Sequence, residues 1–349
     1  MARVFVAMSG GVDSSVAAAM LLEQGHDVTG ITMQLWPSSD DEGDCSSLRS
    51  VRDARRVCDQ LGIEHRVVDF RDAFEREVVA PFADEYAAGR TPNPCIVCNE
   101  RLKFSALHAK ASAQGAEFLA TGHYARLVSD NSGGLWLARG LDVGKDQSYF
   151  LYRLTAAQLA AVMFPVGELA KPDVRALAER LGLHVAEKPD SQEICFAPGG
   201  DHAGVVRERH PQAFTAGEIV DLDGGVVGHH EGVAGFTVGQ RKGIGVAAAE
   251  PLYVVSVDGS ANRVVVGPRD ALQVTCVEAS NAVWRAGGEE RISAMVRYRM
   301  APQAATARFD GLHLAVEFDA PLFGVAPGQA VVCYRGDVCL GGGTIACAS

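Results

Sequence analysis

The sequence of 349 residues has no apolar run long enough to cross a lipid bilayer, and it does not start with a basic and then apolar leader. We therefore expect a cytoplasmic protein that does not enter a membrane. An excess of positive charge is also absent, since the formal net charge is −11. Nonspecific nucleic-acid binding relies on a basic surface, so the charge weighs against it and leaves room only for a local basic groove.

The cysteines do not have the pattern of a disulfide framework. There are nine of them, an odd number in a long chain, which favours a reducing compartment and thiol chemistry. Cys45 follows an acidic stretch, residues 38–44, that is typical of a solvated loop, and no role is assigned to it. Five others occur in an amphipathic or apolar context and are interpreted as small buried side chains: Cys58, Cys276, Cys333, Cys339 and Cys347.

The segment Ser9-Gly10-Gly11-Val12-Asp13-Ser14-Ser15 is the most informative part of the chain. It follows an apolar, strand-like run at residues 4–8 and precedes a helical pattern at 17–22. Glycines at a strand-to-helix turn let the backbone approach a ligand, and the N-terminal end of the helix attracts anions. The Gly-Lys-Ser/Thr ending of a Walker loop is missing. The segment is similar to the pyrophosphate loop of adenylating enzymes, which consume ATP and release pyrophosphate.

Strands and helices alternate in the first part of the chain. This order predicts an α/β fold with a doubly wound parallel sheet that binds ligands at the carboxyl ends of its strands. The expected strands are 4–8, 27–33, 65–68 and 118–121, and the expected helices are 17–23, 47–61, 72–88 and 103–114. Short glycine-punctuated β runs follow. We predict a catalytic domain at residues 1–199, a small central domain at 200–271 and a C-terminal β-barrel at 272–349.

Three further cysteines have a polar context. Cys95 and Cys98 form a Cys-x-x-Cys pair after two prolines, and Cys195 lies far downstream. Such a pair is compatible with zinc, redox chemistry or an iron–sulfur cluster. Zinc is disfavoured because no second pair occurs at zinc-finger spacing. A thioredoxin-like function is disfavoured because the nucleotide loop already implies another fold.

These segments, taken in order, resemble the bacterial tRNA-specific 2-thiouridylases over nearly the whole chain. Besides the glycine loop, the similar segments are residues 91–104, 120–126, 144–151, 190–196, 236–245, 296–299 and 327–329. The resemblance implies that ATP and Mg²⁺ activate the O2 atom of the wobble uridine of tRNA by adenylation. A persulfide on Cys195, supplied by an upstream sulfur-donor protein, would then replace that oxygen. Cys98 would assist by forming a disulfide with Cys195.

The resemblance also implies roles for individual residues. Those expected to bind ATP are Ala7, Met8, Ser9, Gly10, Gly11, Val12, Asp13 and Ser14, with Met33 and Gly122 near the adenosine. Asp13 is also expected to be essential for adenylation. Those expected to contact tRNA or its target base are Asn93, Pro94, Cys95, His123, Lys145, Asp146, Gln147, Arg297, Tyr298 and Gln329. Arg241 and Lys242, between glycines, suit either a phosphate contact or a solvated turn.

One position departs from the family pattern. Many relatives have an aspartate, a proposed general acid or base, where this chain has Cys95, so that role is in doubt. Cys95, Cys98 and Cys195 could instead hold an iron–sulfur cluster with one open iron, whose bound sulfide would be the sulfur donor. Two other functions remain as alternatives: a pyrophosphate-loop amidating synthetase for a small molecule, and a catalytically silent tRNA-binding or sulfur-carrier protein.

Overall fold

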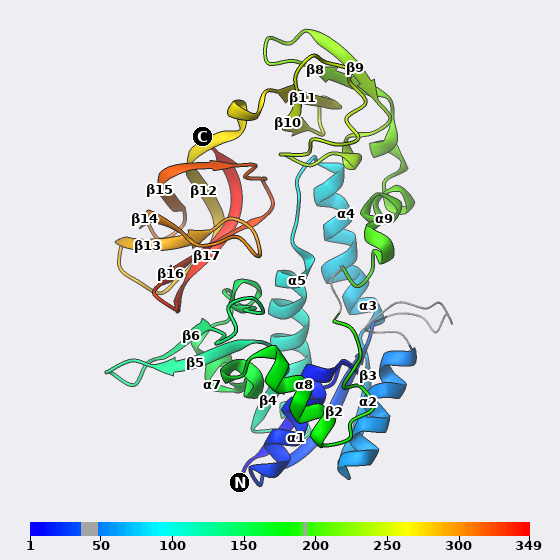
Figure 1. Ribbon diagram of the computed structural model, residues 1–349, viewed down its shortest axis with the longest axis vertical. Coiled ribbons are helices and arrows are strands. Elements are labelled where there is room, and N and C mark those ends of the chain that lie inside the picture. The colour runs from blue at the N-terminus through cyan, green and yellow to red at the C-terminus, as the bar shows by residue number, and fades with distance from the viewer. Residues whose placement is uncertain (36–47, 191–193) are drawn as a thin grey trace. The chain divides into compact units, whose positions relative to one another are not determined.

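The computed structural model describes residues 1–35, 48–190 and 194–349 (Figure 1). The chain forms two compact units. The first consists of Met1–Val78, Cys95–Gly200 and Asp337–Cys339, and the second of Val79–Pro94, Asp201–Gly336 and Leu340–Ser349. Each is described by itself. The acidic stretch 38–44 and Cys45 lie outside the described residues.

The first unit is built on a parallel sheet, as the alternation of elements predicts. Its strands are β1 (Arg3–Ala7), β2 (Asp27–Gln34), β3 (Glu64–Asp69), β4 (Phe118–Thr121) and β7 (Val162–Met163). Their order is β3-β2-β1-β4-β7, with β2 and β4 both parallel to β1. The chain therefore leaves β1 toward one side of the sheet and later returns on the other side. This topological switch point is where doubly wound folds bind ligands.

Helices α1 (Val12–Glu23), α2 (Leu48–Leu61) and α8 (Lys171–Arg180) contribute to one buried apolar cluster with β1. Val4 and Val6 of β1 belong to this cluster, whereas Phe5 between them points to the opposite face and is also fully buried. Burial on both faces explains why the strand is uniformly apolar. The alanines of α1 are small, which lets the helix pack closely on the sheet.

The helix that carries the Cys-x-x-Cys pair starts earlier than predicted. The sequence predicted a helix from residue 103, but helical structure already begins with α5 (Pro94–Val97). It continues through π-helical turns at Cys98–Leu107 into α6 (His108–Ser112). Pro94 occupies the first helical position, where its fixed φ and missing N–H are tolerated. Cys95 and Cys98 consequently lie on a helix and not in a loop.

The predicted helix at 72–88 is present, with an irregular middle. It comprises α3 (Arg71–Phe74), a π-helical turn at Glu75–Val79 and α4 (Ala80–Ala87). Pro81 follows the π-helical turn, which accommodates its missing N–H. The sequence did not predict the hairpin of β5 (Ala125–Ser129) and β6 (Leu135–Arg139), nor α7 (Ala156–Ala160).

The second unit contains two β modules and helices α4 and α9 (His202–Arg209). A four-stranded sheet has the order β10-β11-β8-β9. Its strands are β8 (Gly217–Val220), β9 (Val226–His230), β10 (Tyr253–Asp258) and β11 (Arg263–Gly267). The C-terminal strands β12 (Gln273–Trp284), β13 (Glu289–Met295), β14 (Gln303–Phe309), β15 (Leu314–Phe323), β16 (Ala330–Arg335) and β17 (Val338–Ala348) follow. Pairing of β12 with both β15 and β17 closes these six strands into the predicted barrel.

The five cysteines interpreted as buried divide into two groups. Cys58, Cys333 and Cys339 are buried, and burial raises the pKa of the Cys58 thiol to about 12. The prediction is wrong for Cys347, which is exposed, and Cys276 is only half-buried. Both lie near the ends of barrel strands, where side chains leave the core, and Cys347 Sγ is 3.5 Å from the Glu278 carboxylate.

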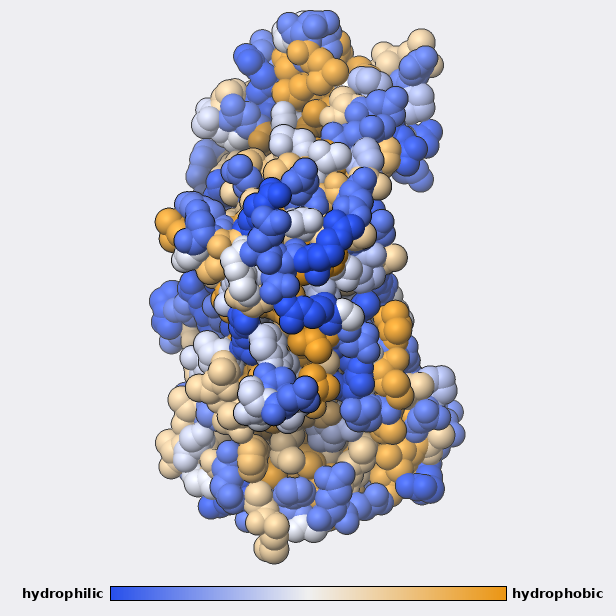
Figure 2. Space-filling view, turned by 90° about the vertical axis from the view of Figure 1, so that its left-hand side faces the viewer, coloured by the Kyte–Doolittle hydropathy of each residue, from blue (hydrophilic) through white to orange (hydrophobic). Residues whose placement is uncertain are grey.

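Among the described residues, no helix is long and apolar enough to cross a membrane. Exposed large apolar side chains do occur, including Leu141, Val143 and Leu312. On the face that Figure 2 displays, hydrophobic residues are scattered among hydrophilic ones.

Candidate functional site

The glycine loop lies at the switch point, between the end of β1 and the start of α1. Gly10 has a φ of +70°, and a Cβ atom there would lie 2.3 Å from the carbonyl oxygen of Ser50 on α2. Only glycine fits this position. Gly11 is the N-cap residue of α1 and has no side chain to cap the helix. The Ser15 hydroxyl donates to the Gly11 carbonyl at 2.8 Å, which fixes the turn. The loop thus has the geometry of an anion cradle.

Gly122 follows β4 and packs against the same loop. A Cβ atom on it would lie 2.5 Å from the backbone nitrogen of Ser14 and 2.6 Å from the carbonyl carbon of Asp13. The backbone of Gly122 therefore touches the first turn of α1 directly. Met33, the other residue expected near the adenosine, lies in β2, the strand next to β1, and is half-buried.

A partly buried ion-pair network continues from the loop. The Oδ1 atom of Asp13 accepts hydrogen bonds from Lys171 Nζ at 2.6 Å and from Tyr124 Oη at 2.8 Å. Lys171 also lies 2.8 Å from Asp190 Oδ1, and Lys145 donates to Asp190 Oδ2 at 2.7 Å. Residues from five separate stretches of the sequence meet here, and each belongs to the first unit.

The network controls the ionisation of its members. Burial raises the pKa of Asp190, but hydrogen bonds from Lys145 and Lys171 outweigh this effect and hold it at about 2. Burial, together with the neighbouring Asp13 carboxylate, raises the pKa of Tyr124 well above its usual range. Tyr124 is therefore a neutral hydrogen-bond donor to Asp13 at neutral pH.

A second ion pair supports the loop from the other side. Lys188 Nζ donates to the Gly10 carbonyl at 2.9 Å and to Asp53 Oδ2 at 2.7 Å. Burial raises the pKa of Asp53, but the Lys188 hydrogen bond and charge, with help from His184, bring it below its usual value. Sequence reasoning missed Lys171, Tyr124 and Lys188. Tyr124 lies within the segment 120–126 that carries the family resemblance, but neither lysine lies in a segment singled out there.

The residues expected to contact tRNA in the first unit are mostly tied into this network. Lys145 pairs with Asp190, and Gln147 accepts the Tyr124 N–H through Oε1 at 3.0 Å. Asp146 is only 5% exposed, and its carboxylate accepts hydrogen bonds from Gly140, Ser148 and Arg139. It acts inside the fold by holding the turn that carries its two neighbours.

His123 packs against aromatic rings at the end of β4. Its ring lies 5.7 Å from that of Phe104 and 6.3 Å from that of Phe164, and its Nδ1 atom is 2.7 Å from the Thr121 hydroxyl. Burial and the nearby Lys103 charge hold the pKa of His123 well below its usual range, so the ring is neutral at pH 7.

The three polar-context cysteines differ in exposure. Cys95 is exposed, Cys98 is buried and Cys195 is half-buried. Within residues 1–35, 48–190 and 194–349, no three Cys, His, Asp or Glu side chains are grouped so that they could bind one metal ion.

In the second unit, the loop of residues 327–329 holds the segment that leads to Asn93 and Pro94. Gln329 Nε2 donates to the Thr91 carbonyl at 3.0 Å, and the Thr91 N–H donates to the Pro327 carbonyl at 2.8 Å. Gly328 has a φ of +91°, and a Cβ atom there would lie 2.9 Å from the Thr91 nitrogen. Part of the Gln329 side chain is thus used to position residues next to Asn93.

Arg297 and Tyr298 lie in the turn after β13 and not on the strand itself. Arg297 is exposed, and its guanidinium lies 3.4 Å from the Phe323 carbonyl. The Arg299 guanidinium lies 5.6 Å from the centre of the Tyr298 ring. An exposed turn with two arginines and an aromatic ring has the composition of a nucleic-acid contact.

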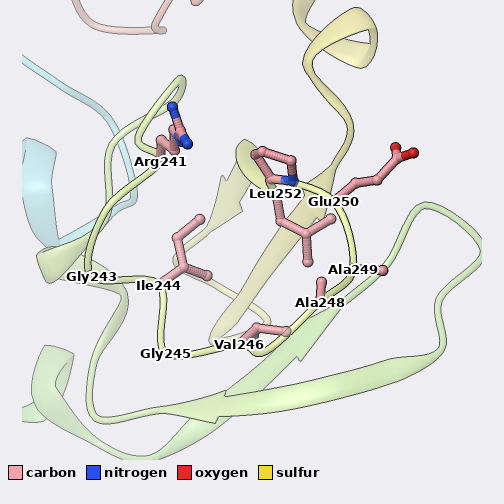
Figure 3. Close-up of a pocket in the computed structure, with 10 residues that line it drawn as sticks. Arg241, Gly243, Ile244, Gly245, Val246, Ala248, Ala249, Glu250 and Leu252 are labelled. Carbon is pink, nitrogen blue, oxygen red and sulfur yellow. The ribbon is translucent and has the colours of Figure 1, made fainter.

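The central module contains a pocket of about 370 Å³, formed by the loop that precedes β10. Its lining includes Arg241, Ile244, Val246, Glu250 and Leu252. Figure 3 shows Ile244 and Leu252 turned toward its interior, whereas Glu250 points away from it. Gln240 shapes the loop, because its side chain accepts the Thr237 N–H at 3.0 Å and donates to the Lys242 carbonyl at 2.9 Å. Arg241 and Lys242 are exposed.

Family models divide the chain into three domains. The tRNA methyl transferase HUP domain matches residues 2–199, the tRNA methyl transferase PRC-barrel domain matches 204–268, and the aminomethyltransferase β-barrel domain matches 274–345. The parallel sheet with its glycine loop and the two β modules that follow thus define the class: a HUP domain followed by two small β domains.

Comparison with curated proteins narrows the class to one family. The tRNA-specific 2-thiouridylase MnmA of Heliobacterium modesticaldum is 50% identical, over 98% of this chain and 92% of its own length. That of Geobacter metallireducens is 49% identical, over 98% of this chain and 96% of its own. The chain belongs to the tRNA-specific 2-thiouridylase family. A solved 4-thiouridine synthetase–RNA complex with bound ATP is 18% identical over 60% of this chain and 51% of its own, with a TM-score of 0.39, too distant to bear on function.

Proposed function

We propose that this protein uses ATP to replace the O2 atom of the wobble uridine of tRNA with sulfur. The observation that carries the proposal is the glycine loop at the switch point, with Asp13 held at the start of α1, in a chain that also has Cys98 and Cys195. The loop would bind the phosphates of ATP, and the two thiols would carry and release the sulfur. The similarity to tRNA-specific 2-thiouridylases supports tRNA as the substrate.

In the first step the phosphates of ATP bind the loop. Backbone N–H groups at the start of α1 hold them, and the positive end of the helix dipole favours their charge. Asp13, in the first turn of α1, is a carboxylate at the loop that fits Mg²⁺, which binds proteins through one or two carboxylates and the substrate phosphates. When bound, Mg²⁺ neutralises phosphate charge. The uracil O2 atom then attacks the α-phosphorus, the bond to the β-phosphate breaks, and pyrophosphate leaves with the electron pair.

In the second step a persulfide on Cys195 attacks C2 of the activated base. The new C–S bond displaces AMP, whose leaving oxygen is the original O2 atom. The Cys98 thiolate then attacks the Cys195 sulfur, and the electron pair of the broken S–S bond forms the C=S bond of 2-thiouridine. A disulfide between Cys98 and Cys195 remains and must be reduced by a thiol. The persulfide comes from a donor protein. Solvent access at Cys195, which is half-buried, suits a sulfur acceptor.

Residues of both units are proposed to contact tRNA, and they range from exposed, as for Arg297, to half-buried, as for His123. In the first unit we assign Cys95, His123, Lys145 and Gln147 to the target base and its surroundings, with Asp146 fixing the turn. In the second unit we assign Asn93, Pro94, Gln329, Arg297 and Tyr298, with Arg241 and Lys242 as phosphate contacts. The small number of cations fits a protein of net charge −11 that binds one kind of RNA.

The decisive experiment is mass spectrometry of the wobble nucleoside after incubation of unmodified tRNA with the protein, ATP, Mg²⁺ and a persulfide source. We expect 2-thiouridine both in air and under anaerobic conditions. Product that appears only without oxygen and with added iron and sulfide would favour the cluster route. Absence of product under both conditions would contradict the proposal and favour an amidating synthetase.

The cysteine roles predict two different losses. Cys195→Ser is expected to retain tRNA-dependent pyrophosphate release but to make no 2-thiouridine, because only the sulfur carrier is missing. Cys98→Ser should allow one C–S bond to form without release of the thiolated base. Cys58→Ser, a change at a buried thiol away from this chemistry, is the control for thiolation. Equal loss of pyrophosphate release and sulfur incorporation in Cys195→Ser would show that Cys195 is not the carrier.

A further inference from the structure

Lys171 is a buried cation at the phosphate loop that the proposed reaction does not yet use. It is 7% exposed, and its ammonium lies between the carboxylates of Asp13 and Asp190. Its position is fixed, because its backbone N–H, at the first residue of α8, donates to Asp142 Oδ2 at 2.9 Å. A buried ammonium is costly unless it is paired, so a lysine held this closely has a defined partner.

The Asp13 carboxylate, a partner of Lys171, lies close to the phosphate-binding end of α1 and could itself compete for it. Asp13 lies in the first turn of α1, whose N-cap residue, Gly11, has no capping side chain. A carboxylate in the first turn is attracted to the unpaired N–H groups there and to the helix dipole. Unless it is held elsewhere, the Asp13 carboxylate would occupy the cradle that an incoming phosphate needs.

We propose that Lys171 is a positioning residue of the ATP site, which holds the Asp13 carboxylate away from the N-terminal N–H groups of α1. Tyr124 assists from the same side, as the second donor to Asp13 Oδ1. The inference rests on the proposed function, since the anion that needs the cradle is the triphosphate of ATP. Lys171 acts through Asp13 and does not itself contact the phosphates.

A double-mutant cycle tests this mechanism through equilibrium binding of ATP in the presence of EDTA. Loss of a charge-assisted hydrogen bond of about 2 kcal/mol corresponds to a loss of more than tenfold in affinity, so Lys171→Met should bind ATP at least ~10-fold more weakly. Adding Asp13→Ala to Lys171→Met removes the competing carboxylate, and affinity should recover to within ~3-fold of wild type. Lys110→Met, the same substitution at an exposed lysine, is the matched control and should leave the affinity unchanged.

A second pair of variants separates positioning from folding. Lys171→Met leaves Asp190 with one partner fewer, which should lower Tm. In the double variant Lys171→Met with Asp190→Asn, most of the lost Tm should return. The added Asp190→Asn change should not restore ATP affinity, because Asp13 still lacks its Lys171 partner. Recovery of both together, or unchanged affinity in Lys171→Met, would overturn the proposal. Weak binding that persists in the Asp13→Ala background would mean that Lys171 touches the phosphates itself. A wild-type protein that binds no ATP would instead contradict the proposed function.

Discussion

At the scale of single residues, the site depends on backbone positions that only glycine can occupy. Gly10 approaches the Ser50 carbonyl, and Gly122 approaches the first turn of α1. Both were expected at the ATP site, but as ligand-binding residues. The structure adds a steric reason for them, because each lets two backbone segments meet where a side chain would separate them.

We therefore predict that Gly122→Ala damages the phosphate loop. The new methyl group would lie 2.5 Å from the Ser14 nitrogen, so the end of β4 and the start of α1 must move apart. Overpacking of this kind typically costs about 1–3 kcal/mol, and ATP affinity should fall as the loop shifts. Gly235→Ala, at a position with open space around it, is the matched control. Denaturant unfolding and ATP binding would check both variants, and unchanged values for Gly122→Ala would contradict the steric argument.

The sequence predicted the loop but not its partners, for a physical reason. Seven consecutive residues of suitable type announce the glycine loop, since a turn is a local structure. Lys171 contacts Asp13 from 158 positions away, and Asp190 joins the network through Lys171. Neither residue has a local pattern that distinguishes it from a surface residue. Only the fold brings them together. The burial of Asp146 is likewise not visible in its neighbouring residues, so no local pattern indicates that this residue lies inside the fold.

At the scale of elements, the apolar patterns predicted the strands β1 to β4 and the helices α1 and α2. The strand Phe118–Thr121 has the predicted bounds. The helix start at Pro94 was missed, because two prolines within four residues normally indicate a turn, whereas the second proline here begins a helix. The short elements between residues 125 and 160 were also missed, since each buries only a few side chains.

The loop of residues 327–329 contacts the Thr91 segment, although the two are far apart in the sequence. This contact can be tested. Gln329→Ala removes the hydrogen bond to the Thr91 carbonyl, so the Thr91 amide should exchange with solvent about five- to tenfold faster, as expected for ~1 kcal/mol. Gln303→Ala, which removes a comparable side-chain hydrogen bond to the Ala301 carbonyl, is the control. Hydrogen exchange read by mass spectrometry gives the result. Unchanged exchange at Thr91 would show that Gln329 does not hold this segment.

At the scale of the whole molecule, the negative net charge sets a constraint on RNA binding. A chain with 43 acidic and 32 basic residues repels a polyanion at long range, so its tRNA contacts must be few and local. Many of its arginines are also neutralised by acidic neighbours. Arg308, for example, pairs with both Glu289 and Glu317 on the barrel. Arg297 has no acidic partner among the described residues, so its charge is available to a phosphate.

The difference between Arg297, which pairs with no described acidic residue, and the paired Arg308 predicts how the affinity for tRNA changes with salt concentration. Each phosphate contact contributes about −0.7 to −0.9 to the slope of log K against log salt concentration, so the wild-type slope should be shallow, at about −2 to −4. Arg297→Ala should make the slope less steep by about one contact and weaken binding at low salt, whereas Arg308→Ala should change neither. Titration of tRNA at several potassium chloride concentrations measures both. A slope as steep for Arg297→Ala as for wild type would mean that Arg297 meets no phosphate. A change in Arg308→Ala would mean that its glutamate partners release it when tRNA binds.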